Sequence, residues 1–253
     1  KFCPHCGRLQ EGGAAATGDA LRSEVDAPVP VPGARAAFTV PFRGREEELA
    51  AVRRFLAGDD PCLELTGEDG TGKAALLEAA FGATTDTVAR VLRILPDLPG
   101  ARRAWWPVRA LVVELGQLGA EPSPGEVTAL CHRLGLDTLD EPHALHLFDL
   151  PGAPAGLENR VRLREMTVTA ARLIHRATVD RPTLLVFQDA HLLDGPSLAV
   201  LERLATLCAE AGGARLIVTA RVPVVPEVAL GRPPVRISLE RLSSSVARQL
   251  CME

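Results

Sequence analysis

Residues 63–77 read L-E-L-T-G-E-D-G-T-G-K-A-A-L-L, and this stretch decides the fold of the 253-residue chain. It joins a short apolar run to a turn with three glycines, a lysine and a helix-forming segment. We predict a buried strand over 62–66 and a helix over 74–81. In an ordinary strand–turn–helix corner the glycines would only supply positive φ angles, and a lysine directly after them has no role. The lysine therefore favours a turn that binds a ligand.

The turn matches the phosphate-binding pattern G-x-x-x-x-G-K-[S/T] at every position except the last. Its backbone amides and the N-terminus of the next helix can surround a polyphosphate, whose outer phosphates Lys73 can reach. Ala74 stands where the pattern has a hydroxyl that ligates Mg²⁺. We expect ATP or ADP as the ligand and only weak Mg²⁺ binding. The binding residues expected in this segment are Gly67, Glu68, Asp69, Gly70, Thr71, Gly72, Lys73, Ala74 and Ala75.

The composition is that of a globular protein with few aromatic side chains. Apolar residues make up 47% of the chain and aromatic residues 4%, so Leu, Val and Ala must fill the core. The net charge is −4 with both signs well mixed, which argues against direct nucleic-acid binding. No apolar run approaches the roughly 20 residues of a membrane helix, and no signal peptide is recognisable. We expect a cytoplasmic protein, of which this chain, beginning at Lys1, is a piece.

The six cysteines form two groups. Cys3-Pro4-His5-Cys6-Gly7 resembles one knuckle of a zinc ribbon, in which both thiolates face one metal ion. Tetrahedral Zn²⁺ needs four ligands, and no second knuckle follows within 7–61. Cys3 and Cys6 are therefore expected to bind zinc only if another knuckle precedes them in the parent protein. The other four are expected to be small apolar core residues, namely Cys62, Cys131, Cys208 and Cys251.

The chain divides into four parts. We predict half a zinc ribbon over 1–10, a linker rich in Gly, Ala and Pro over 11–36, a nucleotide-binding domain over 37–240 and the start of a helical domain over 241–253. Strands alternate with helices inside the large domain, which predicts a three-layer α/β sandwich with a parallel sheet of about five strands. The strands are expected near 62–66, 87–95, 183–189, 215–221 and 235–239. The helices are expected after Gly44, over 74–81, two or three times within 99–160, and over 160–179 and 197–211.

The apolar strand over 183–189 ends in a carboxylate, Asp189. Ligands of such sheets bind outside the carboxyl ends of the strands, so Gly67 and Asp189 are expected at one edge. An acidic residue there holds Mg²⁺ or polarises the attacking water, and Gln188 occupies the place of a second carboxylate. The alternative is an aspartate that merely caps the turn that follows.

Four motifs together resemble the nucleotide domain of STAND-type signal-transduction ATPases. These are AAA-like modules of bacterial cyclases, protein kinases and LuxR-type regulators. The motifs are Phe42-Arg43-Gly44-Arg45-Glu46, the phosphate loop, Gln188-Asp189-Ala190-His191-Leu192-Leu193-Asp194 and Val218-Thr219-Ala220-Arg221. The resemblance spans about 36–250 and implies a P-loop domain that binds ATP or ADP within a multidomain signalling protein.

The resemblance also implies roles for single residues. Lys73 would contact the outer phosphates and Asp189 would activate water, so these two are the candidate catalytic residues. Thr219 and Arg221 would report on the terminal phosphate, although a plain surface arginine is an equal alternative for Arg221.

Further roles concern the nucleotide base and the histidine of the third motif. Phe42 and Arg45 would lie near the base. His191 is better explained as a structural histidine with satisfied hydrogen bonds. Arg241-Leu242-Ser243 resembles the step that leads into the following helical domain.

Two departures from the resembled motifs affect the metal site. The usual Ser or Thr is Ala74, and the usual first acid is Gln188. Phosphoryl transfer depends on the metal and on positioned charge, so hydrolysis is expected to be slow or absent while binding survives. We therefore favour a regulatory switch that acts on neighbouring domains of the same polypeptide, or within a homo-oligomer. The alternatives are an active Mg²⁺-dependent ATPase and a scaffold that binds no nucleotide.

Overall fold

The computed structural model describes residues 43–82, 90–96, 104–152, 156, 158–226 and 233–242. The chain divides into two units, Lys1–Pro41 and Phe42–Glu253, and every described residue belongs to the second. The expected zinc-ribbon half, the linker, Phe42 and all but two residues of the expected helical domain lie outside the described residues.

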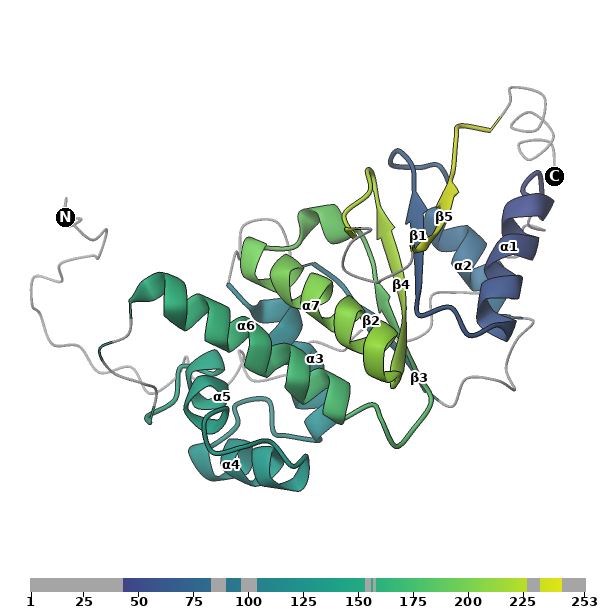
Figure 1. Ribbon diagram of the computed structural model, residues 1–253. Helices are drawn as coiled ribbons and strands as arrows, with labels where there is room; N and C mark the ends of the chain where they lie inside the picture. Colours follow the sequence, from purple (N-terminus) through teal and green to yellow (C-terminus); the bar gives the residue numbers. More distant parts are fainter. Residues whose placement is uncertain are drawn as a thin grey trace, which may run out of the picture. The chain divides into compact units, whose positions relative to one another are not determined.

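Five parallel strands form one sheet with the order β2-β3-β4-β1-β5, which confirms the predicted sheet (Figure 1). Because all strands run the same way, their carboxyl ends lie at one edge. β3 is an interior strand, buried at every position, as its unbroken apolar sequence predicts. The strands are β1 (Cys62–Thr66), β2 (Arg90–Ile94), β3 (Thr183–Phe187), β4 (Ala214–Ala220) and β5 (Val235–Ser238).

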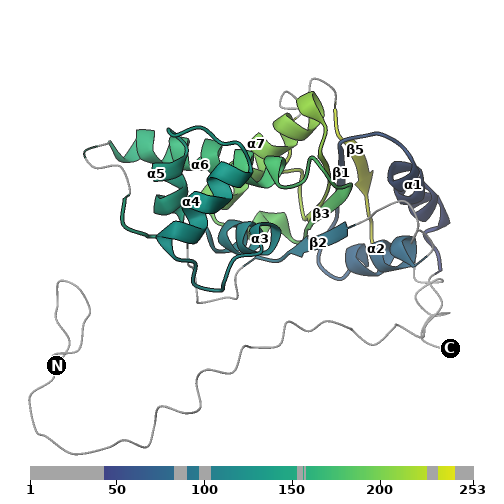
Figure 2. The ribbon, with the colours of Figure 1, turned by 90° about the horizontal axis from the view of Figure 1, so that it is seen from below.

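Helices cover both faces of the sheet and complete the three layers (Figures 1 and 2). α1 and α2 lie on one face, and α3, α6 and α7 lie on the other, where α4 and α5 extend the helical layer beyond the sheet. Among the described residues, no helix has both the length and the apolar character needed to cross a bilayer. The helices are α1 (Glu46–Ala57), α2 (Lys73–Phe81), α3 (Trp106–Gly116), α4 (Pro124–Arg133), α5 (Glu141–Leu147), α6 (Asn159–Arg176) and α7 (Gly195–Ala211), with a 3₁₀ turn η1 at Ala190–Leu192.

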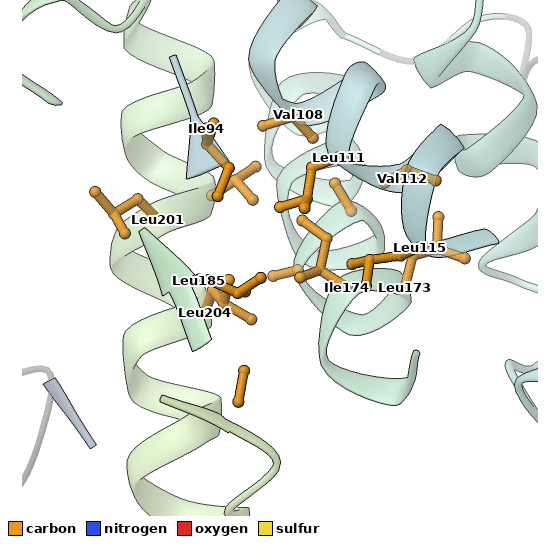
Figure 3. Close-up of a cluster of buried hydrophobic side chains, with 14 of the residues drawn as sticks. Ile94, Val108, Leu111, Val112, Leu115, Leu173, Ile174, Leu185, Leu201 and Leu204 are labelled. Atoms are coloured by element: carbon orange, nitrogen blue, oxygen red, sulfur yellow. The ribbon is translucent and has the colours of Figure 1, made fainter. Parts of the chain in front are cut away.

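The two faces of the sheet have separate apolar cores. Successive strand residues point to opposite faces, so Leu184 and Val186 of β3 pack towards α1 and α2, whereas Leu185 and Phe187 pack towards α3, α6 and α7. Figure 3 shows part of the larger core, where aliphatic side chains of α3, α6 and α7 meet those of the strands. Leu and Val supply most of this packing, as the low aromatic content requires.

Helix bounds differ from the predicted ones by up to three residues, since the helix predicted over 160–179 ends at Arg176. α4 begins at Pro124 because Ser123 and Glu126 form a capping box. α7 begins two residues earlier than predicted, because the Asp194 carboxylate accepts the amide of Ser197 at 3.0 Å. Pro124 and Pro196 lie in the first turns of α4 and α7, where a missing N–H has no cost.

Candidate functional site

The glycine-rich loop between β1 and α2 is curled, and its first glycine is required by packing. Gly67 has φ +149°, and its amide donates to the Ala220 carbonyl oxygen at 3.1 Å. A Cβ atom at this position would lie 2.5 Å from the Leu239 carbonyl oxygen and 2.9 Å from Thr71 Oγ1. The loop is therefore fixed between β4 and the end of β5, and only glycine fits there.

The last glycine of the loop has no side chain that could bond to the first amides of α2. Gly72 has φ +92° and is the N-cap of α2, with no side chain capping the helix. The first-turn amides of a helix have no partner inside the helix, and they carry its partial positive charge. Ala74 is exposed and Ala75 is half-buried in this first turn. The segment thus presents donors and positive potential, which suits the phosphates of a nucleotide.

Lys73 lies across the loop. Its Nζ donates to the carbonyl oxygens of Gly67 and Glu68 at 2.5 and 3.0 Å, and the residue is 7% exposed. The Glu68 carbonyl also accepts the Thr71 hydroxyl at 2.8 Å. These bonds hold the loop closed around the ammonium group, so a bound polyphosphate must replace carbonyl oxygens as the partner of Lys73.

The carboxylate at the end of β3 is held by its backbone. Asp189 has φ +48°, and its amide donates to the Thr219 hydroxyl on β4 at 2.9 Å. Gln188 precedes it, half-buried, with its amide bonded to the Ile94 carbonyl oxygen at 2.9 Å. Within the part of the chain that the structure describes, the Asp189 carboxylate makes no hydrogen bond. Thr219 is thus a positioning group for Asp189, a contact that the sequence pattern did not reveal.

A salt bridge joins the loop to the end of β4. Arg221 Nε donates to Asp69 Oδ1 at 2.9 Å, and its Nη2 donates to Oδ2 of the same carboxylate. The hydrogen bond from Arg221 lowers the pKa of Asp69, and the charges of Arg221, Lys73 and His191 lower it further. The hydrogen bond and charge of Asp69 raise the pKa of Arg221, and Glu68 and Asp189 add to the effect.

The charged groups that follow three of the strands thus influence one another's pKa values. The loop follows β1, Asp189 follows β3 and Arg221 follows β4, so all three lie at the shared edge of the sheet. The arrangement can hold a polyphosphate on the loop, with a carboxylate and a guanidinium group beside it.

Arg45 borders a pocket beside the loop. It is 6% exposed and donates to Glu48 Oε1 at 3.0 Å and to the Glu240 carbonyl oxygen. Ser238 pairs with Thr66, the residue before the loop, so this pocket lies next to the phosphate-binding segment. Its volume is about 380 Å³, and it is lined by Gly44, Arg45, Glu48, Ser238, Glu240, Arg241 and Leu242.

A buried carboxylate behind the site was missed by the sequence analysis. Glu64 in β1 is fully buried, accepts the amides of Val224 and Val225, and pairs with Arg236 Nε at 3.0 Å. It therefore anchors the segment that follows Arg221. The signal was available, because Glu64 is a charged residue at the centre of an otherwise apolar strand.

The expectation for His191 was wrong. Both of its ring nitrogens are buried and have no hydrogen-bond partner among the described residues. It lies close enough to Asp69 to affect that carboxyl group. His191 therefore belongs to the surroundings of the loop.

The sheet order and the curled loop define a P-loop nucleotide-binding domain. Comparison with protein families narrows the class, because residues 41–218 match the model of the AAA ATPase domain. This match covers well over half of the chain, which therefore belongs to the AAA ATPase domain family. The family implies nucleotide binding, usually with Mg²⁺.

Similar solved structures share little sequence with this chain. A DNA replication initiation factor is 12% identical with a TM-score of 0.40, and the match covers 85% of this chain and 51% of that one. The Orc1 protein of Aeropyrum pernix in complex with DNA is 15% identical with a TM-score of 0.41, and the match covers 84% of this chain and 49% of that one. A putative metal-chelate type ABC transporter in an inward-facing conformation is 16% identical with a TM-score of 0.37, and the match covers 73% of this chain and 70% of that one. The matches thus span about half the length of the first two. A search of curated proteins finds no match.

Proposed function

We propose that this domain is a STAND-type regulatory switch that binds ATP or ADP and hydrolyses ATP slowly or not at all. The supporting observation is the convergence of the closed loop, Asp189 and Arg221 at one edge of the sheet. A switch of this kind needs only different nucleotide affinities in two conformations, not fast turnover.

Binding would use the loop amides from 67 to 75, with Lys73 exchanging its two carbonyl partners for phosphate oxygens. The pocket beside Arg45 is the proposed site of the base, with Phe42 close by in sequence. Thr219 would keep Asp189 in place through its amide, and Arg221 would contact the terminal phosphate. These roles follow the chemistry of each group at its observed place.

Weak hydrolysis follows from two side chains at the metal position. Mg²⁺, when bound, neutralises phosphate charge and takes one or two ligands from the protein. The Ala74 side chain offers no oxygen atom and Gln188 offers no charge, which leaves Asp189 as the carboxylate that follows β3. Asp189 would then either hold the metal or activate water, and neither assignment supplies both functions.

The wider setting is inferred from the sequence motifs. We infer that the domain acts on neighbouring domains of a larger cytoplasmic signalling protein, or between copies in a homo-oligomer. Cys3 and Cys6 would bind zinc there together with a preceding knuckle. Mixed surface charge provides no argument for nucleic-acid binding.

The proposal predicts saturable ATP binding that Lys73→Ala abolishes, because the mutant lacks the only loop side chain that carries positive charge. Isothermal titration of the wild type, with and without Mg²⁺, measures the binding. Arg164→Ala is the matched control, since Arg164 is an exposed cation on α6, whose other face packs against α5 and α7. It should bind like the wild type.

Other outcomes separate the alternatives. ATP binding that persists unchanged in Lys73→Ala contradicts the proposed site. No binding by the wild type favours the nucleotide-free scaffold, whereas Mg²⁺-dependent phosphate release that Asp189→Asn removes favours an active ATPase.

A further inference from the structure

The Asp69–Arg221 salt bridge occupies the group that would contact the terminal phosphate. Arg221 donates through Nε and Nη2, and both oxygen atoms of Asp69 accept. A guanidinium group uses the same two-pronged geometry for a carboxylate and for a phosphate. This edge of Arg221 therefore cannot bind Asp69 and a phosphate group at the same time.

Stability does not explain an aspartate at this position. Asp69 is 61% exposed and Arg221 is 48% exposed, and exposed ion pairs contribute little to stability. The loop geometry does not require aspartate either, because position 69 has no positive φ angle and the phosphate-loop pattern accepts any residue there. The exposure of both side chains also means that a ligand can reach them.

The surrounding charges make the competition sensitive to the ligand. Glu68, Asp69 and Asp189 lie around Arg221, while Lys73 and His191 lie near Asp69. A diphosphate adds charge mainly where the loop amides and Lys73 lie. In the proposed binding mode, a triphosphate would place a further charged group beyond them, where it would replace the carboxylate of Asp69 on Arg221.

We infer that Asp69 is a specificity-determining residue, which holds Arg221 until a terminal phosphate displaces it. This inference rests on the proposed function. Asp69 lowers the affinity for ATP more than the affinity for ADP, because only the terminal phosphate must break the salt bridge. The wild-type domain thus discriminates less between the two nucleotides than the loop and Arg221 would by themselves.

The test measures the dissociation constants of ATP and ADP by titration calorimetry. Asp69→Asn should tighten ATP binding about two- to fivefold, the range that an exposed ion pair allows, and should tighten ADP binding less. Glu68→Gln is the matched control, because it removes one negative charge from the same loop and leaves the salt bridge intact. It should change the ratio of the two dissociation constants less than Asp69→Asn does, because it breaks no hydrogen bond to Arg221.

The double mutant Asp69→Asn/Arg221→Gln tests whether Asp69 acts through Arg221. In the Arg221→Gln background, removing the Asp69 charge should leave the ADP-to-ATP ratio of dissociation constants unchanged. An unaltered ratio in Asp69→Asn alone, or an equal change in both backgrounds, overturns the inference. Failure of the wild type to bind either nucleotide contradicts the proposed function as well, so the two failures are distinguishable.

Discussion

At the residue scale, the proposed slow hydrolysis depends on two side chains. Ala74 is exposed in the first turn of α2, and Gln188 is half-buried at the end of β3. Neither residue belongs to either apolar core, so an oxygen ligand and a charge can be introduced at these positions. The proposed weak hydrolysis is therefore attributed to the identity of these two side chains and not to backbone geometry.

We predict that the double mutant Ala74→Ser/Gln188→Asp gains Mg²⁺-dependent hydrolysis on the order of tenfold or more over the wild type, because it restores a hydroxyl ligand and a second carboxylate. Release of inorganic phosphate with ATP in excess measures the gain. Adding Asp189→Asn to the double mutant should remove it. A double mutant that binds ATP but hydrolyses no faster than the wild type would show that these two positions do not limit catalysis.

Glu64 links three segments at the scale of secondary-structure elements. It lies in β1, pairs with Arg236 of β5 and accepts two amides of the segment 222–226 after β4. Arg236 also donates to the Val225 carbonyl oxygen at 3.0 Å. A carboxylate in the centre of a sheet is stable only when its oxygen atoms are bonded. The same bonds position the chain directly after Arg221.

Removal of Arg236 should therefore destabilise the fold. We expect Arg236→Met to lower the free energy of unfolding by about 3 kcal/mol, because it leaves Glu64 buried without its cation. Urea denaturation followed by circular dichroism measures the change. Arg93→Gln is the control, since Arg93 also lies in a strand and pairs with Glu78 but both side chains are exposed. Its effect should stay below about 1 kcal/mol, and equal effects of the two mutations would contradict the proposed role of Glu64.

At the scale of the whole molecule, buried thiols make the stability of the fold depend on pH. Cys62 of β1 and Cys208 of α7 are buried in the larger core, and burial raises the pKa of each thiol to about 12. Cys131 of α4 is raised to about 11, again mainly by burial. The unfolded chain binds fewer protons than the native state once the pH exceeds the ordinary thiol pKa.

The fold should consequently lose stability at alkaline pH. The contribution of these thiols is fully present below about pH 9 and declines as the pH rises towards 12, by about 1.4 kcal/mol per pH unit for each thiol that ionises only on unfolding. The chain has no tyrosine and only two lysines, Lys1 and Lys73, so few other groups titrate between pH 9 and 11. Urea denaturation at pH 7 to 10.5 tests this. Cys208→Ala should show a shallower decline, and a flat profile in the wild type would exclude the effect.

Local patterns predicted the fold to within a few residues. The sequence pattern placed all five strands, most clearly β1 and β3, because strands buried on both faces need mostly apolar sequence. The start of α7 at Gly195 was displaced, because it depends on the cap formed by Asp194. Such caps are hydrogen bonds within one turn, and a proline there can equally well end a helix.

The sequence by itself determined the phosphate-binding loop, the parallel sheet and the strand that Asp189 follows, because glycine spacing and apolar periodicity are local properties. Only the tertiary structure decided which groups meet at the sheet edge. It pairs Arg221 with Asp69, puts the Thr219 hydroxyl on the Asp189 amide and buries Glu64 against Arg236. These partners are far apart along the chain, and the strand order that brings them together follows from packing of the whole sheet.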